Sequence, residues 1–125
     1  MRSAQLVLVV EDDPGLRRMV SAQLRSLRYD VMEAADALAA LESLENNCKV
    51  DLLLTDVVLS DDFNGVDLGH IARELRPQLK LMYMSAYPAS APEAGTPLEP
   101  GVQLLRKPFR RSDLATAVER ALNNR

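Results

Sequence analysis

Short apolar segments alternate along this chain with amphipathic segments, and this alternation constrains the fold more than any other sequence feature. The first apolar segment, residues 6–10, contains only Leu and Val, which is typical of a strand buried on both faces. Asp13 and Pro14 follow. Asp13 suits the N-cap of a helix, and Pro14 is a favoured first helical residue. Apolar residues then recur at helical spacing up to residue 27. We therefore predict a strand over 6–10 and a helix over 14–27.

The same alternation continues to the C-terminal end of the chain. Further strands are predicted at 29–34, 50–55, 81–84 and 102–106, with helices beginning after Asp36, after the loop 60–65 and at a Ser112 cap. Such alternation indicates right-handed crossovers and a parallel sheet covered on both faces. The fold class is therefore α/β: a flavodoxin-like doubly wound sheet of five strands, in the order 2-1-3-4-5, with about five helices.

One stretch departs from this rhythm. The segment 87–101 contains four prolines where the alternation calls for a fourth helix. Proline removes a helical hydrogen bond and clashes with the preceding turn. We therefore expect the fourth helix to be short or irregular, within a single domain that spans residues 1–125.

Composition and charge exclude several classes of protein. The chain is 47% hydrophobic and 26% charged with a net charge of −3, which is typical of a soluble globular domain and disfavours a nucleic-acid-binding surface. Cys48 is the single cysteine, so no internal disulfide can form. The apolar segment 6–10 is too short for a signal peptide or a membrane span. We therefore expect a cytoplasmic protein that binds neither nucleic acid nor membranes directly.

Polar side chains follow four of the five predicted strands. Glu11 and Asp12 follow the first strand, Asp56 the third, Ser85 the fourth and Lys107 the fifth. Because ligands bind outside the carboxyl ends of parallel strands, we expect these side chains to share one site. Crowded carboxylates repel one another, and a hard cation such as Mg²⁺ removes that repulsion. With an ammonium and a hydroxyl nearby, the set suits phosphoryl transfer to a nucleophilic aspartate.

Four stretches of the sequence, read together, resemble a known family. The stretches 9–13 (VVEDD), 55–56 (TD), 84–86 (MSA) and 107–109 (KPF) resemble, in the same order, the signatures of the receiver domain of two-component response regulators. The resemblance covers essentially the whole chain. Over residues 55–59 and 64–68, the sequence is particularly similar to receivers fused to hybrid sensor histidine kinases.

The resemblance implies a phosphoprotein of a phosphorelay signal-transduction pathway, which takes a phosphoryl group from a phosphohistidine in an Mg²⁺-dependent reaction. The implied donor is a sensor histidine kinase or a histidine phosphotransfer protein. The sequence leaves open whether the chain is a stand-alone regulator or part of a hybrid histidine kinase, and whether it forms a homodimer.

The resemblance also implies a role for each site residue. Asp56 would be the phosphoacceptor and form the aspartyl phosphate, with catalytic roles for Lys107 and for Ser85 as the conformational switch. The implied metal ligands are Asp12, Asp56, the backbone carbonyl of Val58 and, through water, Glu11. The implied phosphate contacts are Ser85, the backbone amide of Ala86, and Lys107.

Two departures from the family pattern bear on regulation. Leu104 stands where many receivers carry an aromatic residue that reports the state of the switch. Together with the proline-rich segment 87–101, it leaves the output mechanism open. Val58 and Tyr87 flank the expected reaction path, and neither offers an acid or an amide to orient a hydrolytic water. We therefore expect a self-phosphorylating domain that dephosphorylates itself slowly, rather than an enzyme with turnover.

Other functions fit the sequence less well. The main alternative is a receiver-like interaction module that is regulated without phosphorylation, although no acid, acceptor or lysine is missing. Aspartyl-phosphate phosphohydrolases usually place a second acid two residues after the nucleophile, where this chain has Val58. A flavin or dinucleotide site is unsupported because no Gly-rich loop follows the first strand.

Overall fold

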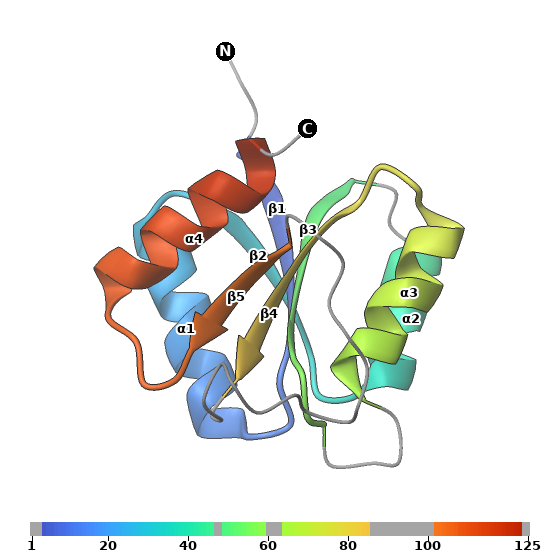
Figure 1. Ribbon diagram of the computed structural model, residues 1–125, viewed down its shortest axis with the longest axis horizontal. Coiled ribbons are helices and arrows are strands. Elements are labelled where there is room, and N and C mark those ends of the chain that lie inside the picture. The colour runs from blue at the N-terminus through green and yellow to red at the C-terminus, as the bar shows by residue number, and fades with distance from the viewer. Residues whose placement is uncertain (1–3, 47–48, 60–63, 86–101, 124–125) are drawn as a thin grey trace.

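Five parallel strands form the central layer of the molecule, and helices cover both of its faces (Figure 1). The computed structural model describes residues 4–46, 49–59, 64–85 and 102–123. The strands are β1 (Leu6–Val10), β2 (Asp30–Ala34), β3 (Val50–Asp56), β4 (Lys80–Ser85) and β5 (Gln103–Arg106). Their spatial order is β2-β1-β3-β4-β5, so the predicted fold class and strand order are confirmed.

Four helices lie in the described part of the chain: α1 (Pro14–Ser26), α2 (Ala37–Asn46), α3 (Gly65–Leu75) and α4 (Arg111–Asn123). Helices α1 and α4 cover one face of the sheet, and α2 and α3 cover the other (Figure 1). The short or irregular helix expected between β4 and β5 lies in 86–101, outside the described residues. No helix among the described residues is long and apolar enough to cross a membrane.

The core consists of two apolar layers, one on each face of the sheet. Leu8, Leu53 and Tyr83 belong to the layer beneath α2 and α3, whereas Val9 and Leu54 belong to the layer beneath α1 and α4. Successive residues of a strand point to opposite faces, and here both faces are covered. The continuous apolar segments therefore reflect burial on both sides of the central strands.

Side-chain caps fix where the first two helices begin. The Oδ1 atom of Asp13 accepts a hydrogen bond from the backbone N–H of Gly15 at 2.9 Å. The Oδ1 atom of Asp36 accepts one from the backbone N–H of Ala39 at 2.8 Å. Both caps were predicted from the sequence, and they satisfy amide groups that have no partner within the helix.

The predicted cap of the last helix was wrong. Helix α4 already begins at Arg111, so Ser112 lies inside its first turn. The Asp113 carboxylate reaches back and accepts a hydrogen bond from the backbone N–H of Arg110 at 2.9 Å. The cap position is therefore Arg110, two residues before Ser112, and the acid in the first turn satisfies the N–H that precedes the helix.

Candidate functional site

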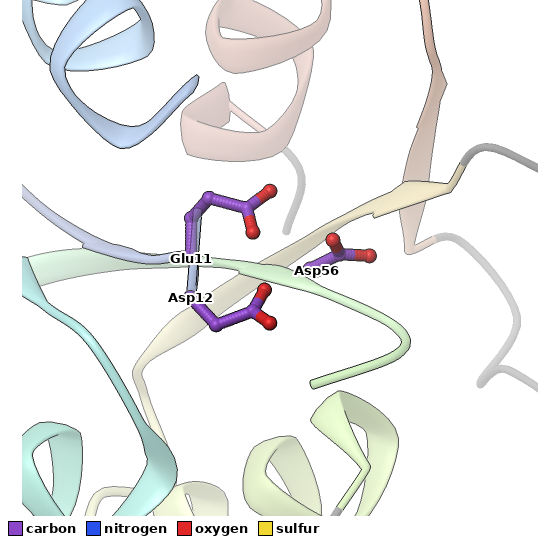
Figure 2. Close-up of side chains that lie close together, drawn as sticks. All are labelled: Glu11, Asp12 and Asp56. Carbon is purple, nitrogen blue, oxygen red and sulfur yellow. The ribbon is translucent and has the colours of Figure 1, made fainter. Parts of the chain in front are cut away.

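Three carboxylates converge where β1 and β3 end. Glu11 and Asp12 follow β1, and Asp56 is the last residue of β3. The two strands are paired so that Val10 lies opposite Thr55, and the residues that follow therefore emerge side by side. One carboxylate oxygen of each acid lies within 4.8 Å of the other two. Figure 2 shows the side chains of Glu11 and Asp12 extending toward Asp56.

Lys107 supplies positive charge to this cluster from the end of β5. Its Nζ atom lies 2.6 Å from Oδ2 of Asp56 and 2.9 Å from Oε1 of Glu11. The backbone N–H of Lys107 donates to the carbonyl oxygen of Ser85 at 2.7 Å, which fixes the lysine beside the end of β4. The structure thus brings together the acids and the ammonium that the sequence predicted for one site.

The protonation state of Lys107 follows from its neighbours. Burial alone would lower the pKa of the Lys107 ammonium, but its hydrogen bonds to Asp56 and Glu11 and their negative charges outweigh burial and raise the pKa above its usual 10.5. Lys107 therefore stays positively charged at neutral pH.

Glu11 is the most enclosed member of the cluster. Its side chain is only 2% exposed, and each of its carboxylate oxygens has a partner. Oε1 accepts from Lys107, and Oε2 accepts from the backbone N–H of Asp13 at 3.1 Å. A buried carboxylate needs such partners to offset the loss of water. Glu11 is consequently oriented by the protein itself.

Hydrogen bonds from Val58 and Gly65 fix the backbone that follows Asp56. Oδ1 of Asp56 accepts a hydrogen bond from the backbone N–H of Val58 at 3.2 Å. The N–H of Gly65 donates to the carbonyl of Val57 at 2.7 Å, so the start of α3 packs onto the end of β3. A Cβ atom on Gly65 would lie 1.9 Å from the backbone oxygen of Asp56. Only glycine therefore fits this position.

Two further predicted site residues, Ser85 and Val58, adjoin Lys107 and Asp56. Ser85 is buried at the end of β4, and the Val58 side chain is exposed. Ala86 and Tyr87 lie outside the described residues. Leu104 lies on β5 and is partly exposed.

Sequence reasoning missed two residues of the site. The sequence places Gly65 in the predicted loop 60–65 and indicates no role for Arg17. In the structure, Nη1 of Arg17 donates to the carbonyl oxygen of Glu11 at 2.7 Å. The available signal was the place of Arg17 in the first helical turn, four residues after the Asp13 cap, from which a side chain can reach the preceding loop.

The fold and this arrangement define an α/β protein with an acidic site at the carboxyl end of a doubly wound sheet. The family model described as the response regulator receiver domain matches residues 7–119. The chain therefore belongs to the response regulator receiver family, as its sequence predicted.

Individual relatives agree with this assignment. The response regulator receiver protein CpdR of Brucella abortus is 32% identical over 118 residues, which cover 93% of this chain and 95% of CpdR. The sensor kinase CckA of the same organism is 34% identical over 117 residues, which cover 93% of this chain but 12% of the kinase. The solved receiver domain of hybrid histidine kinase CckA matches with a TM-score of 0.77 at 32% identity, over 94% of this chain and 99% of that domain.

Proposed function

We propose that this chain, as one receiver domain over residues 1–125, accepts a phosphoryl group on Asp56 from a phosphohistidine in the cytoplasm. The observation that carries the proposal is the position of Asp56, whose carboxylate lies among two other acids and 2.6 Å from the Lys107 ammonium. Family membership supports a sensor histidine kinase or a histidine phosphotransfer protein as the donor. The match to CckA supports a phosphorelay of the hybrid-kinase type.

The acids of the site suit Mg²⁺. Three carboxylates offer oxygen atoms within 4.8 Å of one another, and Mg²⁺ prefers hard oxygen ligands together with water and phosphate. Asp12, Asp56 and the backbone carbonyl of Val58 would hold the ion directly. Glu11, the most enclosed of the three acids, would act through water. Bound Mg²⁺ supplies charge that offsets repulsion between these acids and the phosphoryl oxygens.

The chemical step follows from the residues that surround Asp56. A lone pair of the Asp56 carboxylate forms the new O–P bond while the P–N bond of the donor breaks, and its electron pair returns to the imidazole. Lys107 and Ser85 contact the transferred phosphoryl oxygens, with the backbone amide of Ala86 as a further donor. Transfer of this kind depends on positioning and charge stabilisation. We expect the domain to take up the phosphoryl group in this way and to lose it slowly, rather than to turn over a substrate.

A small phosphodonor tests the proposal without a partner kinase. Incubation with phosphoramidate and Mg²⁺ should add one phosphoryl group to the intact protein, as measured by mass spectrometry. Asp56→Asn should abolish the gain. Asp51→Asn, on an exposed residue of the same strand, is the matched control and should retain it.

Two results would count against the proposal. A phosphoryl gain that persists in Asp56→Asn would assign the acceptor elsewhere. A wild-type protein that gains no phosphoryl group from any small donor, with or without Mg²⁺, would favour the interaction module that works without phosphorylation.

A further inference from the structure

Arg17 binds the main chain on both sides of Asp12. Its Nη1 atom donates to the carbonyl oxygen of Glu11 at 2.7 Å. Its own backbone N–H donates to the carbonyl oxygen of Asp13 at 2.9 Å. Its Nε atom donates to Oε1 of Glu33 on β2 at 3.3 Å. One residue therefore connects the β1–α1 loop to the first turn of α1 and to the edge strand.

These contacts matter because of where the sheet ends. Strand β1 ends at Val10, and the N–H of Glu11 donates to the carbonyl of Ala34. The carbonyl oxygen of Glu11 belongs to the peptide group that joins Glu11 to Asp12, so holding this oxygen fixes the direction in which Asp12 leaves the strand. The Asp12 side chain is exposed, so the core does not enclose it.

We propose that Arg17 is a positioning residue that holds Asp12 toward Asp56 and thereby sets the affinity of the acidic cluster for a divalent cation. This inference rests on the proposed function, because it concerns the same metal site. Arg17 acts through the Glu11–Asp12 peptide and contacts neither the metal nor the phosphoryl group. Glu33 has a secondary role, since it orients the guanidinium from β2.

The loss of the Arg17 charge and the loss of its hydrogen bond to Glu11 predict opposite changes in Mg²⁺ affinity for Arg17→Ala. An arginine near a cation site repels the cation, so removing its charge alone would tighten Mg²⁺ binding. Loss of the hydrogen bond to Glu11 would instead release Asp12 and weaken binding. Removing a residue that orients a metal ligand typically costs 10-fold or more in affinity, and we expect the Mg²⁺ dissociation constant to rise by roughly tenfold.

The experiment compares two neighbouring arginines of one helix. Arg17→Ala and Arg18→Ala remove the same charge, but the side chain of Arg18 is exposed and has no hydrogen bond or ion pair with the described residues. Mg²⁺ is titrated while the amide NMR resonances of Asp12 and Asp56 are followed. Arg17→Ala should weaken Mg²⁺ binding and Arg18→Ala should not. Arg17→Lys, which keeps the charge and one donor, should recover part of the loss.

A second measurement separates this inference from the proposed function. In metal-free protein, Arg17→Ala should move the Asp12 amide resonance and increase its hydrogen exchange, whereas Arg18→Ala should leave both unchanged. An unmoved Asp12 amide, or Mg²⁺ binding as tight as in the wild type, would overturn the role of Arg17.

If the wild type binds no Mg²⁺, the proposed function fails, and the metal-free comparison still decides whether Arg17 positions Asp12. Should Arg17→Ala fail to fold, the metal-free Asp12 amide of Glu33→Gln decides the question, because for this variant loss of charge and loss of orientation would both weaken Mg²⁺ binding. Glu33→Gln should shift the Asp12 amide by a smaller amount than expected for Arg17→Ala, and an unshifted amide would overturn the inference.

Discussion

The two ends of the sheet are built from similar residue types but differ in what those residues do. At the carboxyl end, the charged groups of Glu11, Asp56 and Lys107 face one another. At the amino end, a cleft of about 460 Å³ lies between the starts of β3 and β4 and the ends of α3 and α4. Its volume lies in the range of small-molecule sites.

Two charged side chains of that cleft bind the main chain. The Asp51 carboxylate accepts a hydrogen bond from the backbone N–H of Leu6, and Arg76 donates to the carbonyl of Leu44. Convergent side chains, rather than hollow volume, therefore mark the end of the sheet where we propose that phosphoryl transfer occurs.

Replacing Lys107 should have the largest effect. Lys107→Met removes the fixed positive charge beside Asp56, so phosphorylation by phosphoramidate should slow by about 10²-fold, the usual loss when a charge-stabilising donor is removed. Lys80→Met, which removes a lysine at the amino end of β4, should leave the rate nearly unchanged. Equal rates for the two variants, measured by mass spectrometry over time, would contradict the contrast between the two ends.

The pH dependence of stability offers a second check on Lys107. Its pKa in the folded protein lies above the ordinary 10.5, so the ammonium contributes stability fully below pH 10.5 and loses that contribution as the pH rises through the folded value. The difference in unfolding free energy between the wild type and Lys107→Met should be constant from about pH 6 to pH 9. Denaturant titrations that show this difference shrinking near neutrality would refute the assignment.

Gly65→Ala should have the next largest effect. The added Cβ atom would meet the Asp56 backbone oxygen at 1.9 Å, and the backbone must move to relieve the overlap. We expect a loss of about 2 kcal/mol in unfolding free energy, together with slower phosphorylation. Gly15→Ala is the control. A Cβ atom added at Gly15 would lie 3.4 Å from its nearest neighbour, and alanine is more favourable than glycine inside a helix. Urea denaturation of both variants should show a loss only for Gly65→Ala.

Val58 should influence how long the phosphoryl group persists. Its apolar side chain is 43% exposed beside Asp56, where an amide could orient a hydrolytic water. Val58→Asn should speed phosphate loss by about tenfold, which corresponds to ~1.4 kcal/mol, the size of one hydrogen bond. An unchanged or slower loss of phosphate after removal of the donor would contradict this role.

The smallest effect is expected at the amino end. Asp51→Ala removes the hydrogen bond from Leu6 to the Asp51 carboxylate, 2.8 Å long and exposed. The unfolding free energy should fall by about 0.5–1 kcal/mol, with the phosphorylation rate unchanged. A slower rate in this variant would show that the two ends are coupled through β3.

Most of the fold was predictable because its pattern is local. The continuous apolar segment 6–10 indicated a strand buried on both faces, and Asp13 indicated where a helix begins. The positions of Asp12, Asp56 and Lys107 after predicted strands indicated the site, because parallel strands bring such residues to one end. Each inference depends on position along the chain, which the sequence states directly.

The features that escaped prediction depend on how side chains and loops meet in space. Ser112 was predicted as the cap of the last helix, but the path of the backbone begins α4 at Arg111 and lets Asp113 accept from the N–H of Arg110. The close approach of Gly65 to Asp56 depends on how α3 packs against β3. The contact of Arg17 with the Glu11 carbonyl depends on the angle between α1 and the sheet.

The ion pair between Lys107 and Glu11 joins residues that lie 96 positions apart. The polypeptide must therefore be synthesised through Lys107 before this pair can form, and β5 must add to the sheet beside β4 to deliver the lysine. A fragment that ends before β5 retains all three acids without the ammonium that balances them. If Asp56 is the acceptor, a copy of the domain truncated before β5 should therefore accept the phosphoryl group far more slowly.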